Sequence, residues 1–440
     1  MPTIVFISPF IWEGGPHKGK ATVYYIMRGF VRAGYSVHVV SATNEPGPLN
    51  VELDELHIHY FRIPINPVTF QYSALRSYLS LIRVEPNRLV RHLKFRLFWL
   101  QFVFLGFFKT LLLGHRIRPK LLYGINNPGI PIASSVGWIL GIPNFSRIMG
   151  SPLGEWARDH ISYSSAKDGS IQSHSRGLFR LWLARFDELL AFRLPSSAVI
   201  VTDDATISRH LITDWLGVPD INVWLLRNGI DKQLFQSGLD QRAARDALGI
   251  PINAQVVLWV SQLVDWKHTE RLIEAIPEIV SDCPSAYFLI VGGGPERPYL
   301  EQRVQTLKAS AVTRFTGFVR RDQIPIYYRA ADVFAAFYDY ANVSNTLLEA
   351  MLSGNAVITL DNGHTSEVVR HLQNGYLVDP SNIQEIPSAI VRLLTDDPFR
   401  QQLQSAAMVY SDKEFLTWDE RIDREIIRIE SILDKENKKP

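Results

Sequence analysis

Short apolar runs alternate with longer amphipathic or polar segments along the whole chain. In the first half the runs cover 3–8, 36–42, 56–63, 120–126, 142–151 and 197–204, and in the second half they begin at 254, 286, 333 and 356. Runs of this length, bounded by turn residues, are typical of buried strands, and the segments between them are long enough for helices. The alternation predicts an α/β fold with parallel sheets covered by helices on both faces.

Length and turn signals divide the chain into two domains. A chain of 440 residues is long enough for two domains of ordinary size. Asn228 and Gly229 form a strong turn signal where the first half gives way to the second. We expect a first domain over 1–222 and a second over 223–412. The last segment, 413–440, has apolar residues at helical spacing and predicts an amphipathic helix.

The stretch 338–367 predicts a strand, a loop, a helix, a strand and a second loop. The first loop contains polar residues that are candidate helix N-caps. Doubly wound sheets bind ligands at the carboxyl ends of their strands, on helix N-termini. The free amides from Val343 to Thr346 would therefore suit a phosphate. Glu349, one turn into the helix, could accept a hydrogen bond from a sugar hydroxyl.

Two glycine-rich loops also follow predicted strands. Gly15 lies in the first, between the first strand and the first helix, and Gly293 lies in the second, within the run 292–294. Glycine lets a backbone approach a ligand closely. The first loop could instead be a mobile turn, and the second could allow a helix to pack closely. Taken alone, each loop is a weak signal.

A longer series of residues resembles the nucleotide-binding signature of a known family. The series consists of Glu349-Ala350-Met351, Gly354, Val357-Ile358, Gly363, Glu367 and Asn374-Gly375. It is similar to the signature of retaining GT-B glycosyltransferases, specifically glycosyltransferase family 4, or glycosyl transferases group 1. The resemblance covers nearly the whole chain, but it is strong from 254 to 380 and loose before 220.

The resemblance implies a fold and a reaction. The fold would be GT-B, with two doubly wound Rossmann-like domains facing a cleft and a C-terminal helix crossing back to the first domain. The first domain would be the acceptor side and the second would bind the nucleotide-sugar. The reaction would be transfer of a hexose from a nucleotide-sugar to an acceptor hydroxyl, with retention at the anomeric carbon. The acceptor would be a glycan or a lipid-linked glycan.

The resemblance also implies site residues. The catalytic candidates are Lys267 and Gln262, which would bind the diphosphate, and Arg147, which would border the donor or acceptor. The donor-binding candidates are Gly15, Gly293, Phe318, Val319, Val343, Ser344, Asn345, Thr346, Glu349 and Glu367. Neither a metal nor a cofactor other than the nucleotide-sugar co-substrate is expected, since backbone dipoles and cations can carry the charge of the leaving diphosphate.

Four positions depart from the family's pattern, and one of them is Ser261, which replaces the Gly that begins the family's Gly-Arg-Leu. Ala341 stands where the signature has its first Glu, which would reach the donor sugar, and Asp339 is a possible substitute. Gln262 replaces an Arg, so it can donate a hydrogen bond but supplies no charge. His268 replaces the Gly that follows the family's Lys. A non-catalytic nucleotide-sugar-binding subunit with a degenerate site is therefore an alternative, and a phosphorylase or epimerase on the same fold is a third reading.

The environment of one apolar segment is not decided by the sequence. The segment 97–114 is apolar all round in its middle, with a charge-free run of 97–108 that is short for a membrane span. Basic residues precede and follow that run. It could be a buried core helix, a helix that contacts a membrane surface, or a true span. We expect peripheral contact with an anionic membrane to be possible through 88–118.

Composition and charge narrow the classes of protein to which the sequence can belong. The first 220 residues carry 23 Lys and Arg against 15 Asp and Glu, and the others carry 23 against 29, so the basic half could face an anionic surface or simply be solvated. A single cysteine, Cys283, excludes an intrachain disulfide. The N-terminus has no basic region before its apolar run, which predicts a cytoplasmic protein. No basic recognition motif for nucleic acid is present.

Overall fold

A computed structural model of the chain forms two compact units. It describes residues 1–9, 21–43, 47–63, 86–149, 189–203, 212–213, 217–236, 238, 240–339, 343–363 and 365–436. The first unit comprises Met1–Thr202, Arg209–Leu226 and Ile422–Pro440, and the second comprises Asp203–Ser208 and Arg227–Arg421.

The first unit is built on an eight-stranded sheet in the order β3-β4-β2-β1-β5-β6-β7-β8. The strands are β1 Thr3–Ile7, β2 Ser36–Thr43, β3 Asn50–Leu53, β4 Leu56–Arg62, β5 Leu121–Ile125, β6 Asn144–Ile148, β7 Ala198–Thr202 and β8 Val223–Leu226. All neighbouring pairs are parallel except β3 and β4, which are antiparallel. The central strands β1 and β5 consist mainly of buried apolar residues, as expected for a parallel sheet covered on both faces.

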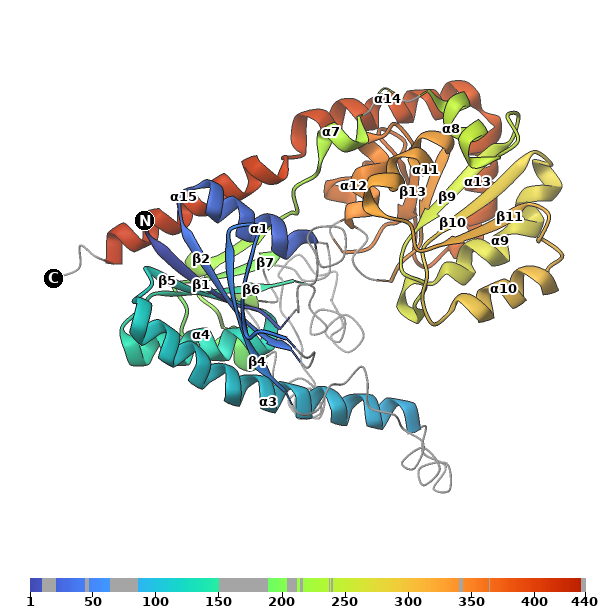
Figure 1. Cartoon of the computed structure of the whole chain (residues 1–440). Helices are drawn as coiled ribbons and strands as arrows, with labels where there is room; N and C mark the ends of the chain where they lie inside the picture. Colours follow the sequence, from blue (N-terminus) through green and yellow to red (C-terminus); the bar gives the residue numbers. More distant parts are fainter. Residues whose placement is uncertain are drawn as a thin grey trace. The chain divides into compact units, whose positions relative to one another are not determined.

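Helices cover both faces of this sheet (Figure 1). They are α1 Ala21–Arg32, α3 Pro86–Ile117, α4 Asn126–Leu140 and α15 Trp418–Glu436. Side chains of β1 alternate between the two layers: Val5 and Ile7 belong to the cluster that packs under α3 and α4, whereas the ring of Phe6 meets Phe30 of α1 at 5.5 Å. The strand period of two thus assigns one core to each face.

The sequence analysis missed two strands of the first sheet. The four residues of β3 were not recognised because only Val51 and Leu53 in it are apolar, and its partner β4 supplies the pattern. The run 223–226 pairs with β7 as β8, so the first unit continues to Leu226 instead of ending at 222. Both errors arise because strand pairing, and not local hydrophobicity, recruits short edge segments.

A buried ion pair fixes α15 in the first unit. The Nη1 atom of Arg147, on β6, donates to Oε2 of Glu425 at 2.9 Å, and both side chains are fully buried. The hydroxyl of Tyr123, on β5, donates to the other oxygen of Glu425. This placement corrects the expectation that Arg147 contacts substrate. Its guanidinium satisfies a buried carboxylate, so its role is structural.

The second unit is built on an all-parallel, six-stranded sheet in the order β11-β10-β9-β12-β13-β14. The strands are β9 Gln255–Val260, β10 Ala286–Val291, β11 Thr313–Gly317, β12 Val333–Ala336, β13 Ala356–Leu360 and β14 Tyr376–Val378. Because the strands are parallel, all their carboxyl ends lie at one edge. The strand order reverses direction between β9 and β12, which is the switch point where such sheets bind ligands.

Helices and short 3-10 turns connect these strands. The helices are α7 Lys232–Phe235, α8 Gln241–Leu248, α9 Thr269–Asp282, α10 Arg297–Thr306, α11 Ile324–Ala330, α12 Asn345–Leu352, α13 Ile386–Thr395 and α14 Asp397–Glu414. The 3-10 turns are η2 Asp220–Asn222 in the first unit and η3 Asp265–Lys267, η4 Arg321–Gln323, η5 Thr365–Glu367 and η6 Ile383–Glu385 in the second. One core cluster spans the second unit from Ile230 to Phe415.

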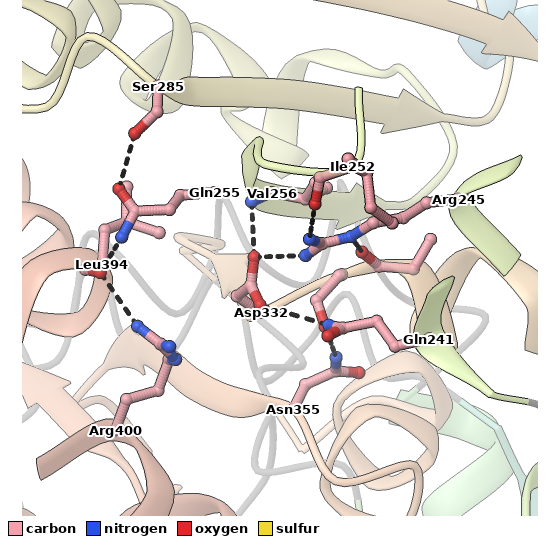
Figure 2. Close-up of polar contacts among 12 residues, drawn as sticks. Gln241, Arg245, Ile252, Gln255, Val256, Ser285, Asp332, Asn355, Leu394 and Arg400 are labelled. Atoms are coloured by element: carbon pink, nitrogen blue, oxygen red, sulfur yellow. Dashed lines mark hydrogen bonds and ion pairs between the residues drawn. The ribbon is translucent and has the colours of Figure 1, made fainter. Parts of the chain in front are cut away.

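The amino ends of β9 and β12 are held by a polar cluster (Figure 2). The carboxylate of Asp332 accepts from Nη2 of Arg245 and from the backbone N–H of Val256, both at 2.7 Å. Gln241 donates to the other carboxylate oxygen at 3.1 Å. Asp332 therefore caps the start of β12, and it lies at the edge of the sheet opposite the strand carboxyl ends.

We predict that Glu425→Ala lowers the free energy of unfolding of the first unit by about 3–5 kcal/mol, because it leaves the Arg147 guanidinium buried without its counter-charge. Chemical denaturation measures this. Asp423→Ala is the matched control, because Asp423 lies on the same helix and pairs with Arg32 at the surface, where its side chain is 53% exposed. That control should cost less than about 1 kcal/mol. Equal losses for the two variants would contradict the structural role of Arg147.

Candidate functional site

Five loops of the second unit meet the carboxyl edge of its sheet. They follow β9, β10, β11, β12 and β13, and they contain most of the residues singled out from the sequence. The exceptions are Asn345, Thr346 and Glu349, which lie on α12, and Arg147, which is buried in the first unit. Gly15 and Ala341 lie outside the described residues. The carboxyl edge is therefore where the candidate chemistry gathers.

The triple glycine after β10 allows two backbones to touch. A Cβ on Gly292 would lie 1.8 Å from the carbonyl oxygen of Ser261, and one on Gly294 would lie 2.2 Å from that of Leu263. Gly292 also has φ of 134°, a conformation that side chains rarely adopt. The close partner of these two glycines is thus the loop after β9. The glycines allow close packing, but the segment that packs against them is the loop after β9 and not a ligand or a helix.

Gly293 lies instead against an exposed aromatic ring. A Cβ there would lie 2.8 Å from Cε2 of Phe318, whose side chain is 80% exposed. Phe318 follows Gly317, which ends β11 with φ of 75°. The ring rests on a glycine surface and leaves its body open to solvent, which suits it to stack on a planar group. Val319, next in the chain, is half-buried.

Lys267 places a cation close to two aromatic faces. Its Nζ atom lies 3.6 Å from the ring centroid of Tyr338 and 4.2 Å from that of Trp266, and the residue is 9% exposed. Cation–π attraction of this kind holds an ammonium in a desolvated place. Burial raises the pKa of Tyr338 to about 12, so its ring stays neutral. The charge of Lys267 is therefore pre-positioned at the end of β12.

The amino terminus of α12 lies beside the same tyrosine. Ser344 caps the helix by accepting from the backbone N–H of Leu347 at 3.3 Å. The N–H groups of Asn345 and Thr346 precede the first intrahelical bond, so they are the donors that a helix N-terminus offers to an anion. Side-chain hydrogen bonds of Tyr338 with Thr346 and Ser261 join this terminus to the loop after β9.

Side chains at this terminus also have partners. The Asn345 side-chain oxygen accepts from Asn228 at 3.0 Å. The hydroxyls of Ser344 and Thr346 lie 2.9 Å apart. Val343, which precedes the cap, is buried. Backbone groups, more than side chains, are thus what this end of α12 presents.

Glu349 is buried and already engaged. It is 3% exposed, its Oε1 accepts from Nη1 of Arg321 at 3.1 Å, and its Oε2 accepts from the hydroxyl of Tyr328 at 3.1 Å. Burial raises the pKa of the Glu349 carboxyl, and the charge of Arg321 opposes that shift. Each carboxylate oxygen has a second lone pair, so the pairing still leaves acceptor capacity. The sequence analysis did not find Arg321 and Tyr328.

Asp339 and His268 form a second charged group at the end of β12. Nε2 of His268 lies 2.6 Å from Oδ2 of Asp339, and Nδ1 lies 2.6 Å from Glu270. Arg271 pairs with the other oxygen of Asp339 at 2.7 Å. His268 adopts φ of 49°, the left-handed region that a glycine at this position would reach without strain. The Asp339 carboxylate is therefore engaged by protein groups.

Two candidates lie at the margin of this group. Oε2 of Glu367, in η5, accepts from Nη2 of Arg227 at 2.8 Å, and the Glu367 side chain is 55% exposed. Gln262 is exposed in the loop after β9. The structure thus brings Lys267, Thr346 and the glycine loop to one end of the sheet, whereas Glu349 lies one helical turn further along α12.

Comparison with known proteins places this edge in a family. Residues 240–409 match the model of glycosyl transferases group 1. The matched segment contains all five loops of the carboxyl edge. The second unit is a group 1 glycosyltransferase domain.

Curated relatives match over longer stretches of the chain than the 170 residues of the family model. An uncharacterized glycosyltransferase of Methanocaldococcus jannaschii is 30% identical over 235 residues, which is 52% of this chain and 59% of the relative. A GDP-mannose-dependent alpha-(1-6)-phosphatidylinositol monomannoside mannosyltransferase of Mycobacterium tuberculosis is 28% identical over 276 residues, which is 60% of this chain and 69% of the relative. The alignments thus span about 60–70% of these relatives.

A solved structure shows the same fold over the whole chain. HepE of Anabaena, determined in complex with UDP and glucose, matches with a TM-score of 0.67 and 20% identity, covering 98% of this chain and 100% of that one. The likeness establishes the GT-B fold for the chain that carries the group 1 domain. The expected GT-B fold, with two Rossmann-like domains, and the expected family of glycosyl transferases group 1 are therefore confirmed.

We predict that the contribution of His268 to stability falls as pH rises. Hydrogen bonds with Asp339 and Glu270 raise the pKa of His268 to about 9, so its stabilisation is fully present below its unfolded value of about 6.5 and is lost through about pH 9. Burial disfavours the Asp339 charge, but bonds from His268 and Arg271 lower its pKa to about 2. The stabilisation that the ionised Asp339 carboxylate contributes is therefore lost only in strong acid.

The measurement is the thermal midpoint of wild type and His268→Gln at about pH 6 and about pH 10. The free energies of unfolding obtained from these transitions should differ by about 1 kcal/mol at the lower pH, after allowance for solvent screening, and by less at the higher pH. A difference that is constant across this range would show that His268 is not charged in the folded protein.

Proposed function

We propose that this protein transfers a hexose from a nucleotide-sugar to an acceptor hydroxyl, with retention at the anomeric carbon. The proposal rests chiefly on one observation: a group 1 glycosyltransferase domain holds Lys267 and the amino terminus of α12 beside the same tyrosine, at the carboxyl edge of a parallel sheet. Cations and helix amides at such an edge bind phosphate groups.

The charges at this edge suit the leaving group of such a transfer. A nucleoside diphosphate gains negative charge as the bond to the sugar breaks, so preorganised donors and cations lower the barrier. Lys267 would supply the cation, and the amides of Asn345 and Thr346 would supply donors. Gln262 would add a neutral donor. In this proposal, no metal ion and no cofactor other than the co-substrate takes part.

The remaining residues would bind the nucleoside and the sugar. Phe318 and Val319 follow β11 next to Gly293, and the exposed ring of Phe318 would stack on the base. Glu349 would accept hydrogen bonds from the ribose hydroxyls while Arg321 balances its charge. Val343 and Ser344 would line the part of the donor site that binds the phosphate groups, and Glu367 would approach the edge of the sugar.

We further propose that the acceptor is a glycan or a lipid-linked glycan. The Mycobacterium tuberculosis relative is named for transfer to a phosphatidylinositol mannoside, and HepE was solved with UDP and glucose. A lipid-linked acceptor would require the enzyme to reach a membrane surface. Peripheral contact with an anionic membrane, from the cytoplasmic side, is therefore part of the proposal.

The testing experiment is a binding and hydrolysis screen of purified protein against UDP-, GDP- and ADP-sugars without added acceptor. Slow release of one nucleoside diphosphate is expected, since transferases leak their donor to water. If one donor binds and is not released, adding a membrane lipid extract should start turnover. Binding without turnover even then would favour a non-catalytic subunit, and no binding to any donor would contradict the proposal.

We predict that Lys267→Ala lowers donor turnover by at least about 100-fold but weakens binding of the free nucleoside by less than about threefold. The reason is that the ammonium acts on the diphosphate and not on the base. Turnover assays and calorimetric titration with nucleoside measure the two effects. Lys413→Ala is the control, because that side chain is 80% exposed on α14. Equal losses in both assays would remove Lys267 from the diphosphate site.

We predict that Glu349→Ala weakens nucleotide binding at least about tenfold, or roughly 1.4 kcal/mol, through loss of the ribose contact. Calorimetric titration measures the affinity. Glu349→Gln separates charge from shape, and circular dichroism checks that each variant is folded. Glu274→Ala is the matched control, since Glu274 pairs with Arg303 at 2.8 Å as Glu349 pairs with Arg321. Unchanged affinity in the folded Glu349 variants would exclude this residue from the site.

A further inference from the structure

The outer side of α3 exposes a line of large apolar side chains. The exposed fractions are 38% for Leu97, 55% for Leu100, 64% for Phe104, 48% for Phe108 and 71% for Leu112. Their spacing of three or four residues places them on one face of the helix, over roughly 22 Å of its length. Contiguous apolar surface of this kind marks an interaction site. We call this set the α3 face.

The opposite side of α3 is fixed in the first unit. Trp99 is 7% exposed and Phe102 and Thr110 are fully buried. A Cβ on Gly106 would lie 2.8 Å from Ile132 of α4, and one on Gly114 would lie 2.9 Å from Leu140, so the two helices touch closely. The segment Arg96–Ile117 is long and apolar enough to span a bilayer by composition, with mean hydropathy of 1.7. If α3 crossed a bilayer, the side of the helix that packs on the sheet would have to leave the core of the first unit.

The charges of α3 have one sign. Its 32 residues include no Asp or Glu. They include Arg88, Arg91, Lys94, Arg96, Lys109 and Arg116. Among the residues whose side chains are described, Arg96 and Arg116 are exposed and lie just beyond the two ends of the α3 face. An apolar face bounded by cations is complementary to an anionic headgroup layer above an acyl region.

The helix beside α3 adds interfacial residues. The last turn of α4 exposes Trp138 at 83% and Ile139 at 48%, and α4 packs against α3 through Ile132 and Leu140. Tryptophan favours the boundary between headgroups and acyl chains, because its ring is apolar and its N–H can be hydrated.

We propose that the α3 face docks the first unit on an anionic lipid bilayer, with α3 lying in the plane of the interface. Leu100, Phe104 and Leu112 enter the boundary of the acyl region, and the flanking cations meet the headgroups. A second copy of this chain fits less well, because symmetric pairing of two such faces would bring like charges together. The inference extends the proposed function, on which it rests for a membrane-linked acceptor, and it names the surface that makes the contact.

The test is flotation of the full chain with vesicles of phosphatidylglycerol and phosphatidylcholine in equal parts, compared with vesicles of phosphatidylcholine alone. Wild type should float with the mixed vesicles, less at high salt, and not with the neutral ones. The variant Phe104→Ser/Leu112→Ser should lose at least about tenfold in partition coefficient. The control variant Val409→Ser/Ile427→Ser removes apolar residues that are 71% and 67% exposed on other helices, and it should float as wild type does.

Other outcomes would overturn the inference. Equal flotation of both variants would show that the contact lies elsewhere, and resistance of bound wild type to alkaline carbonate would indicate a span. A change from dimer to monomer in the Phe104→Ser/Leu112→Ser variant would assign the α3 face to a second copy. Donor binding and hydrolysis, measured on the same samples, separate the two proposals. Lost flotation with intact donor binding and hydrolysis defeats only the membrane contact, whereas absence of donor binding in wild type defeats the proposed function.

Discussion

The parallel order of the second sheet is the constraint on which the candidate site depends. Six parallel strands place all their carboxyl ends at one edge, and reversal of the strand order between β9 and β12 separates the loops that would otherwise pack together. Glycines then allow the loops after β9 and β10 to approach within backbone contact. Lys267 and the amino terminus of α12 are consequently held beside Tyr338 before any ligand arrives, which is the preorganisation that stabilisation of a leaving diphosphate requires.

Buried charges in this protein serve two different purposes. Arg147 and Glu425 neutralise each other inside the first unit, and Arg245 with Asp332 does the same at the amino edge of the second sheet. These pairs are satisfied by protein groups and fix the position of α15 and β12. Lys267 has its ammonium on two aromatic faces at the carboxyl edge, where cation–π attraction holds the charge near the amino terminus of α12.

The sequence predicted the fold class and the composition of the carboxyl edge, because strand runs, glycine loops and signature residues are local patterns. It predicted Arg147 as a ligand contact and was wrong, since only the three-dimensional structure brings Glu425 to it from a helix 278 residues away. It missed Arg321 and Tyr328 for the same reason: neither has a pattern that marks it as a partner of Glu349. The sequence did not decide whether α3 is a buried core helix, a helix on a membrane surface or a membrane span. The reason is that an all-apolar helix has no periodicity that distinguishes its faces.

The most direct test of the central claim is hydrogen–deuterium exchange of the intact protein with and without the nucleoside diphosphate of its donor. Binding at the carboxyl edge predicts slower exchange in four segments of the second unit, namely 261–268, 292–294, 317–319 and 343–349. Amides at the opposite edge, around Arg245 and Asp332, should exchange at unchanged rates. Protection confined to the first unit, or spread evenly over the second without a maximum at these loops, would contradict the account.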